Sequence, residues 1–239
     1  GRRFQQLAVR RAGEIAQLTP TADENGHYKA GVWVRDSGAG IGTMSFVDPQ
    51  RGTFAGLGHS ISDADTGADL TLLSGEIVPV TITGCIRGAA GSPGELRGEF
   101  AAAPAGTVLA NDAAGVYGSY TGSCTAPALP VANLQEVTPG EAELWTTVLG
   151  TTAQPYTIQV ERVTMTGSDP NRNLLVRVTD KRLLDATGGV VQGMSGSPIV
   201  QNGRLAAVLT HVLVNDPSRG YAIFATTMLE KADAVASSK

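Results

Sequence analysis

The run GGVVQGMSGSP at 188–198 places two serines within one tight turn of small residues. A serine hydroxyl attacks a carbonyl group only when a base removes its proton, and the oxyanion that forms needs fixed N–H donors. Gly193 and Gly196 flank Ser195 and allow the backbone to aim the amides of Gly193 and Ser195 at one point. We therefore predict that Ser195 is a nucleophile with these two amides as its oxyanion hole. The simpler interpretation is a Gly-Ser hairpin loop without chemistry.

The chain offers only three histidines as a base for this serine. His59 lies in AGLGHSISDADTG, a glycine-rich strand end followed by carboxylates, where a side chain is presented rather than buried. His211 lies in the apolar run LAAVLTHVLV, which favours a strand-face histidine bonded to backbone. His27 lies in the polar DENGHYK and is expected to be solvated. His59 is therefore the predicted base.

A carboxylate usually orients such an imidazole and stabilises the imidazolium. Asp180 ends the apolar run LLVRVTD, where the alternative role is a helix N-cap. Asp63 and Asp65 follow His59 closely, where aspartates often bond only to the local backbone. The residues alone leave these three candidates open.

Composition and charge exclude several classes of protein. Eighteen basic and 22 acidic residues give a net charge of -4 without a long run of either sign, which argues against nucleic-acid binding. The stretch between Asp185 and Arg204 is too polar for a membrane span. Cys85 and Cys124 lack the second pair that a zinc knuckle requires, and could pair only in an oxidising compartment. We expect no cofactor, no metal and no transmembrane helix.

The elements that must position the site are mostly strands. Short β-branched runs separated by turn residues indicate strands at 31–36, 41–47, 75–84, 106–111, 143–150, 156–165, 174–180, 204–214 and 221–226. Thirty glycines favour closed barrels over a flat sheet. Helical spacing predicts an amphipathic helix over 4–18 and a second helix over 226–236. The stretches 86–105 and 121–140 are expected to be long connections, with 133–140 dividing two β lobes.

Four segments resemble the peptidase domain of the stage IV sporulation protein B (SpoIVB) family. They are GIGTMSFVDP at 40–49, GLGHSISDADTG at 56–67, GELRGEF at 94–100 and the long block at 187–224 that contains GMSGSP. The resemblance spans 31–231 and implies a trypsin-like serine endopeptidase with a two-lobed, chymotrypsin/trypsin-like double β-barrel. It implies a linker or autocleaved segment at 1–30 and a peptidase domain at 31–239, with lobes at about 31–132 and 141–231.

The resemblance also implies roles and partners. His59 would be the base, Ser195 the nucleophile and Asp180, in VTDKRLLDATGG, the third member. Asp63, or a His59–Ser195 dyad, stays open as the alternative. The family acts outside the cytoplasm, between the forespore and mother-cell membranes. There it cleaves itself and a regulatory membrane-protein partner, which triggers activation of a late sigma factor. The family often has glycine after the histidine, where this chain has Ser60.

The chain order His59, Asp180, Ser195 agrees with chymotrypsin-type proteases and disagrees with α/β-hydrolases. A set of Ser195, His211 and Asp216 fits neither order. The rival from another class is a non-catalytic, protease-like module that grips an extended peptide by strand addition. The presence of both His59 and Ser195 favours the enzyme.

Overall fold

The structure is a computed structural model that describes residues 7–11, 14–18, 21–22, 28–29, 39–62, 69–70, 72, 74–124, 126–167 and 169–237. Contacts divide the chain into two units, Gly1–Ala39 and Gly40–Lys239. Each unit is described by itself. The expected boundary at 30/31 and the expected strand at 31–36 lie outside the described residues.

The first unit contains short antiparallel strand pairs. Strands β1 (Leu7–Arg11) and β2 (Glu14–Leu18) pair with each other, as do β3 (Thr21–Ala22) and β4 (Tyr28–Lys29). The helix predicted over 4–18 is therefore wrong within the described residues. Leu7 lies opposite Leu18 in the register of the two strands, and the sequence between them contains Gly13, a residue that is unfavourable in a helix interior.

The first lobe of the second unit is a five-stranded antiparallel sheet with a separate hairpin. The sheet order is β5-β6-β11-β10-β7. Its strands are β5 (Met44–Asp48), β6 (Thr53–Gly56), β7 (Glu76–Ile77), β10 (Gly106–Asp112) and β11 (Gly115–Tyr120). The hairpin consists of β8 (Val80–Ile86) and β9 (Glu95–Phe100).

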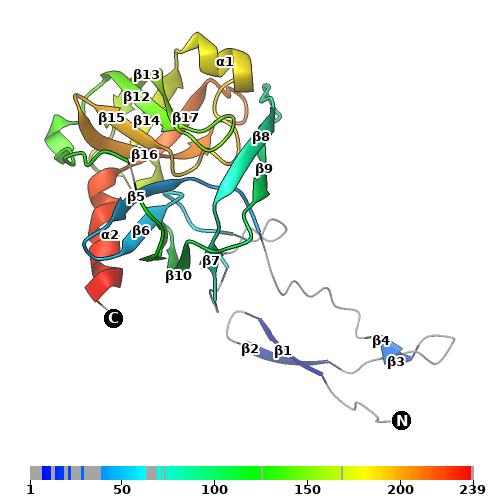
Figure 1. Cartoon of the computed structure of the whole chain (residues 1–239). Helices are drawn as coiled ribbons and strands as arrows, with labels where there is room; N and C mark the ends of the chain where they lie inside the picture. Colours follow the sequence, from blue (N-terminus) through cyan, green and yellow to red (C-terminus); the bar gives the residue numbers. More distant parts are fainter. Residues whose placement is uncertain are drawn as a thin grey trace. The chain divides into compact units, whose positions relative to one another are not determined.

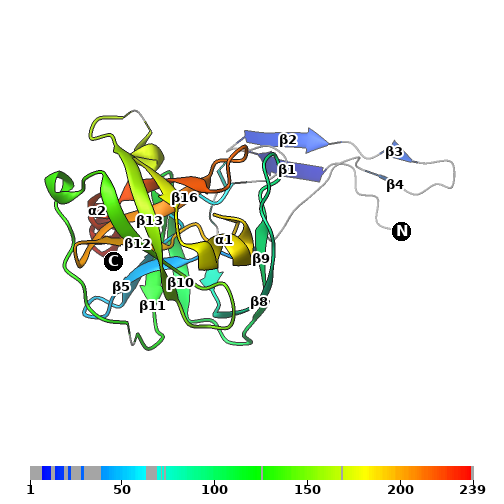
Figure 2. The same ribbon diagram turned by 90° about the horizontal axis from the view of Figure 1, so that it is seen from above.

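The hairpin corrects the expectation that 86–105 is a connection without secondary structure. Strand β9 buries only Leu96, because most of its other side chains are polar or glycine. It therefore lacks the apolar alternation by which a sequence indicates a strand. Figure 2 shows the hairpin beside α1 (Lys181–Thr187), where the Gly88 amide donates to the Thr187 carbonyl at 2.8 Å.

The second lobe is a closed six-stranded barrel in the order β12-β13-β14-β17-β16-β15. Its strands are β12 (Gly140–Thr146), β13 (Gln154–Val163), β14 (Leu174–Val178), β15 (Pro198–Gln201), β16 (Arg204–Val212) and β17 (Arg219–Phe224). Two 3-10 turns, η1 (Leu134–Glu136) and η2 (Pro170–Arg172), lie outside the barrel strands. The largest apolar core of the molecule fills this barrel.

Helix α2 (Ala225–Ser237) fulfils the prediction of a C-terminal helix and joins the two lobes. It contacts β6 and β11 of the first lobe and β16 and β17 of the barrel, and Figure 1 shows it along the flank of both. Met228 is fully buried in an apolar cluster that both lobes share. The helix therefore fixes how the lobes face each other.

The predicted all-β class with two lobes is confirmed, and the strand pairings close the barrel in the second lobe. Cys85 and Cys124 are free thiols. Within the described ranges, no helix has the length and apolarity to cross a bilayer.

Candidate active site

The two serines of the predicted turn differ in accessibility. Ser197 is completely buried, and its hydroxyl has no hydrogen-bond partner among the described residues. Met194 is buried as completely and anchors the turn in the barrel core. Ser195 is only partly buried. Of the two hydroxyls, Ser195 is therefore the one that a substrate can reach.

The backbone of this turn requires glycine on both sides of Ser195. The φ angles are +95° at Gly193 and +98° at Gly196, in the region that side chains disfavour. A Cβ at Gly196 would overlap the Thr43 carbonyl oxygen and lie 2.7 Å from the Leu57 amide nitrogen. Glycine therefore lets the Ser195 turn approach the first lobe at backbone contact.

The amides of Gly193 and Ser195 differ from the neighbouring amides in their hydrogen bonding. The neighbouring amides of Gln192, Met194, Gly196 and Ser197 each donate to a backbone carbonyl at 2.8–3.2 Å. Those of Gly193 and Ser195 have no acceptor anywhere in the described part of the chain. A reacting carbonyl oxygen could therefore accept from both of these amides, which the sequence suggests as an oxyanion hole.

Thr43 and the β8–β9 hairpin hold this turn in place. Thr43 donates from its amide to the Ser195 carbonyl at 2.8 Å and from its hydroxyl to the Gly193 carbonyl at 3.0 Å. Gln192 accepts from the Leu96 amide at 2.9 Å and donates to the Gly94 carbonyl at 2.8 Å. These contacts escaped the sequence analysis because they are backbone bonds between distant segments; only membership of the matched motifs marks Thr43 and Gly94.

The His59 segment packs directly against barrel strand β16. Leu57 and Gly58 have φ angles of +66° and +69°, which turn the chain sharply after β6. A Cβ at Gly58 would lie 3.0 Å from the Thr210 Cγ2 atom. Close approach of the first lobe to the barrel thus brings His59 to the strand that also borders Ser195.

Local contacts fix which nitrogen of His59 carries the proton. Nδ1 lies 2.7 Å from the Ser60 carbonyl oxygen, which can only accept, so Nδ1 donates in the neutral ring and Nε2 keeps its lone pair. Burial lowers the pKa of His59 below its ordinary value, although the Ser60 carbonyl opposes this shift. The imidazole is therefore held neutral, in the tautomer that a base needs at Nε2.

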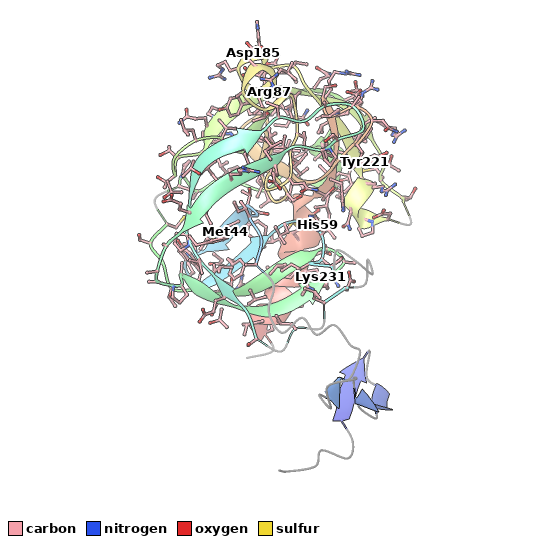
Figure 3. All side chains as sticks on the ribbon, turned by 90° about the vertical axis from the view of Figure 1, so that its right-hand side faces the viewer. Met44, His59, Arg87, Asp185, Tyr221 and Lys231 are labelled. Atoms are coloured by element: carbon pink, nitrogen blue, oxygen red, sulfur yellow. The ribbon has the colours of Figure 1, made fainter. Side chains whose placement is uncertain are left out.

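Ser195 and His59 meet at residues 210 and 211 of β16. The Ser195 hydroxyl donates to the Thr210 carbonyl at 2.6 Å. The imidazole rings of His59 and His211 have centroids 4.7 Å apart, with planes inclined at 33°. Figure 3 shows His59 on the same face as Tyr221, which pairs with His211. Two distant loops thus converge on one strand, although the hydroxyl points to Thr210 and not to His59.

His211 differs from its expected role. It lies on a strand, but it is exposed, and neither ring nitrogen forms a hydrogen bond within the described residues. Its ring contact is with His59. The signal in the sequence was that His211 is one of only three histidines.

Asp180 lies at the N-cap of α1, the alternative role that its position in the sequence allowed. Its carboxylate accepts from the Arg182 amide at 2.9 Å, from the Arg182 guanidinium at 2.7 Å and from the Thr157 amide at 3.2 Å. The Arg182 side chain is the main cause that lowers the Asp180 pKa to about 2. None of its hydrogen bonds reaches His59 or Ser195.

The other candidate carboxylates have different positions. Asp63, Asp65 and His27 lie outside the described residues. Asp216 accepts from the Ser218 hydroxyl, which holds its pKa below the ordinary value. Asp69, which sequence reasoning missed, accepts from the Ser60 hydroxyl, one residue after His59. Its aspartate-rich surroundings in the sequence gave no reason to single it out.

Comparison with known proteins shows the family to which the chain belongs. A family profile described as SpoIVB peptidase S55 matches residues 26–229. Among solved structures, the chain is similar to the active form of the Rv3671c protease from M. tuberculosis, with TM-score 0.41, 16% identity, and coverage of 66% of this chain and 79% of that one. It is also similar to the HtrA-type protease AlgW with decapeptide, with TM-score 0.41, 13% identity, and coverage of 82% and 62%. No curated protein matches the chain. Since the profile spans most of its length, the chain belongs to the SpoIVB peptidase family S55 and is a serine peptidase.

Proposed function

We propose that the chain is an endopeptidase in which Ser195 is the nucleophile, His59 the general base, and the amides of Gly193 and Ser195 the oxyanion hole. One observation carries the proposal. An accessible serine lies in a turn where its own amide and that of Gly193 have no acceptor among the described residues, and it contacts Thr210 of β16 while His59 contacts the adjacent His211. That combination provides the nucleophile, the base and the stabilising donors of acyl transfer.

The proposed reaction begins with a rotation of the Ser195 side chain. The hydroxyl leaves the Thr210 carbonyl and donates to His59 Nε2, which takes the proton as the oxygen attacks the peptide carbonyl. The oxyanion accepts from the Gly193 and Ser195 amides. His59 then returns the proton to the leaving amine, and an acyl-enzyme remains. Water, activated by the same nitrogen, releases the acyl group.

The orientation of His59 needs no carboxylate in this proposal. The Ser60 carbonyl already fixes the proton on Nδ1. Both carboxylate oxygens of Asp180 are engaged by α1 and β13, so its contacts support a structural role. A His59–Ser195 dyad is therefore the arrangement that we carry forward.

The substrates proposed from the family are proteins: the chain itself and a regulatory membrane protein, cleaved outside the cytoplasm during sporulation signalling. Support for this finer role comes from family membership. Intact-mass analysis of purified wild-type and S195A protein tests the self-cleavage. Loss of a segment from residues 1–30 in the wild type alone is expected, and equal cleavage of both proteins would contradict it.

Ser195→Ala tests the nucleophile, with Ser197→Ala as the matched control in the same turn. We expect S195A to lower casein hydrolysis by about 10⁴- to 10⁶-fold, the scale seen when a triad nucleophile is removed. S197A should keep most activity because it deletes a buried hydroxyl that has no partner. Wild-type turnover by S195A would exclude the assignment. Peptide binding by a wild-type protein that cleaves nothing would identify the non-catalytic module instead.

A further inference from the structure

His211 contacts the proposed base, His59, but has no role in the proposed reaction. The 4.7 Å between the ring centroids and the 33° between the planes describe direct, tilted contact of two aromatic rings. No hydrogen bond within the described residues holds the His211 ring from another side. The His211 side chain therefore contacts the candidate site through the His59 ring.

An irregularity in strand β16 sets the orientation of the His211 side chain. The register between β16 and β17 shifts between Leu209 and His211, so Thr210 is left out of the ladder. Thr210 is instead fixed by its hydroxyl, which donates to the Asn171 carbonyl at 2.7 Å. After this irregularity His211 pairs with Tyr221. The bulge thus directs the Thr210 carbonyl at Ser195 and the His211 ring at His59.

We propose that His211 is a positioning residue for the base: its ring forms one wall that keeps the His59 imidazole in place while Nε2 moves a proton. The inference rests on the proposed function. Its physical reason is that His59 has a single fixed hydrogen bond, at Nδ1, around which the ring can still turn. A flat neighbour removes this freedom, and loss of reactive orientation is costly to rate.

The His211 ring must be uncharged at the pH values at which His59 acts as the base. The groups that face His211 are His59, Tyr221 from β17, and Arg172 and Asp169 from η2. Desolvation, His59 and Arg172 lower the pKa of His211 to about 4, and Asp169 opposes them. Arg172 itself lies over the Tyr221 ring at 5.1 Å and pairs with Asp169 at 3.0 Å. Well above this value the His211 ring is neutral and adds no positive charge beside His59.

The test compares His211→Ala with His211→Phe, which keeps a flat ring but cannot titrate. The substrate is a quenched fluorescent peptide whose sequence is taken from mapped cleavage sites in casein. We expect H211A to lower kcat by about 10- to 100-fold with a much smaller change in KM, because orientation and not binding is lost. H211F should stay within about 3-fold of the wild type, because it keeps the flat ring that limits rotation of His59. Equal kcat values for H211A and H211F would overturn the inference.

A second readout does not depend on turnover. In the S195A background, NMR titration of the His59 ring should give a higher pKa for H211A than for the unchanged His211 protein, because water reaches the imidazole when the wall is removed. An unshifted His59 titration would overturn the inference whatever the activity. If H59A retains wild-type turnover, the proposed function fails, and this titration still reports separately on the ring contact.

Discussion

A backbone carbonyl holds the imidazole of His59 in the place where a carboxylate is usual. The Ser60 oxygen fixes the proton on Nδ1, but it carries no full charge with which to stabilise an imidazolium. Burial disfavours the charged ring, and the hydrogen bond to the Ser60 carbonyl offsets only part of this effect. His59, the proposed base, is therefore biased toward its neutral form more strongly than a histidine beside an aspartate.

The pH dependence of activity follows from this environment. Because burial lowers the pKa of His59, the acidic limb of kcat/KM should have its midpoint below the ordinary value of 6.5. Activity is retained as pH falls toward that midpoint and is lost below it, where the imidazole is protonated. A pH profile with the free enzyme and limiting substrate measures this directly. A midpoint above 6.5 would indicate a nearby carboxylate that stabilises the imidazolium.

At the level of elements, short motifs indicate the candidate reactive residues more clearly than the residues that hold them in place. Ser195 and His59 stand out because glycines surround them in patterns that chemistry requires. Thr43, Ser60 and Thr210 contribute through backbone atoms or through contacts across distant segments, which residue type does not reveal. Periodicity also missed β9, which buries little more than Leu96. The pattern of side chains thus indicates what can react, whereas packing determines what holds it.

The N-cap of α1 gives a prediction that separates a structural from a catalytic Asp180. D180A should lower the free energy of unfolding by about 1–2 kcal/mol, the range for loss of a cap, with activity within a few-fold of the wild type. Chemical denaturation measures the first and casein hydrolysis the second. As pH falls from the ordinary pKa of 3.8 to about 2, the two proteins should become equally stable because the carboxylate is protonated.

Asp185→Ala is the control on the same helix. Asp185 pairs with Lys181 at the surface, where both side chains are mostly exposed, so its loss should change stability by about 0.5 kcal/mol or less. A decrease of about 10⁴-fold in the activity of D180A, with stability intact, would restore Asp180 to the catalytic set.

Across the whole second unit, the site depends on how the lobes meet. One apolar cluster combines Ala55 and Tyr117 of the first lobe with Val208 of the barrel and Met228 of α2. Close to this cluster, Gly58 lets the His59 segment pack against Thr210. The sequence indicated two lobes and a final helix. It did not indicate that this helix packs against both lobes, because α2 has an ordinary amphipathic composition.

Met228→Ala tests this coupling. Met228 is fully buried, so its truncation should lower stability by about 2–5 kcal/mol, and activity should fall as the lobes lose their fixed relation. Met165→Ala is the matched control, because Met165 is 47% exposed and its loss should cost about 0.5 kcal/mol or less. Thermal melting and casein hydrolysis provide the two readouts. Full activity of a destabilised M228A protein would show that the site does not need this contact.

Treatment with a fluorophosphonate probe, followed by peptide mapping of the labelled protein, examines the central chemistry most directly. The account predicts that phosphonylation occurs on Ser195, slows greatly in H59A and is absent from S195A. Ser197, in the same peptide, should stay unmodified. Recovery of the probe on another residue, or a casein-cleaving sample that the probe neither labels nor inhibits, would contradict the assignment of Ser195 as the activated nucleophile.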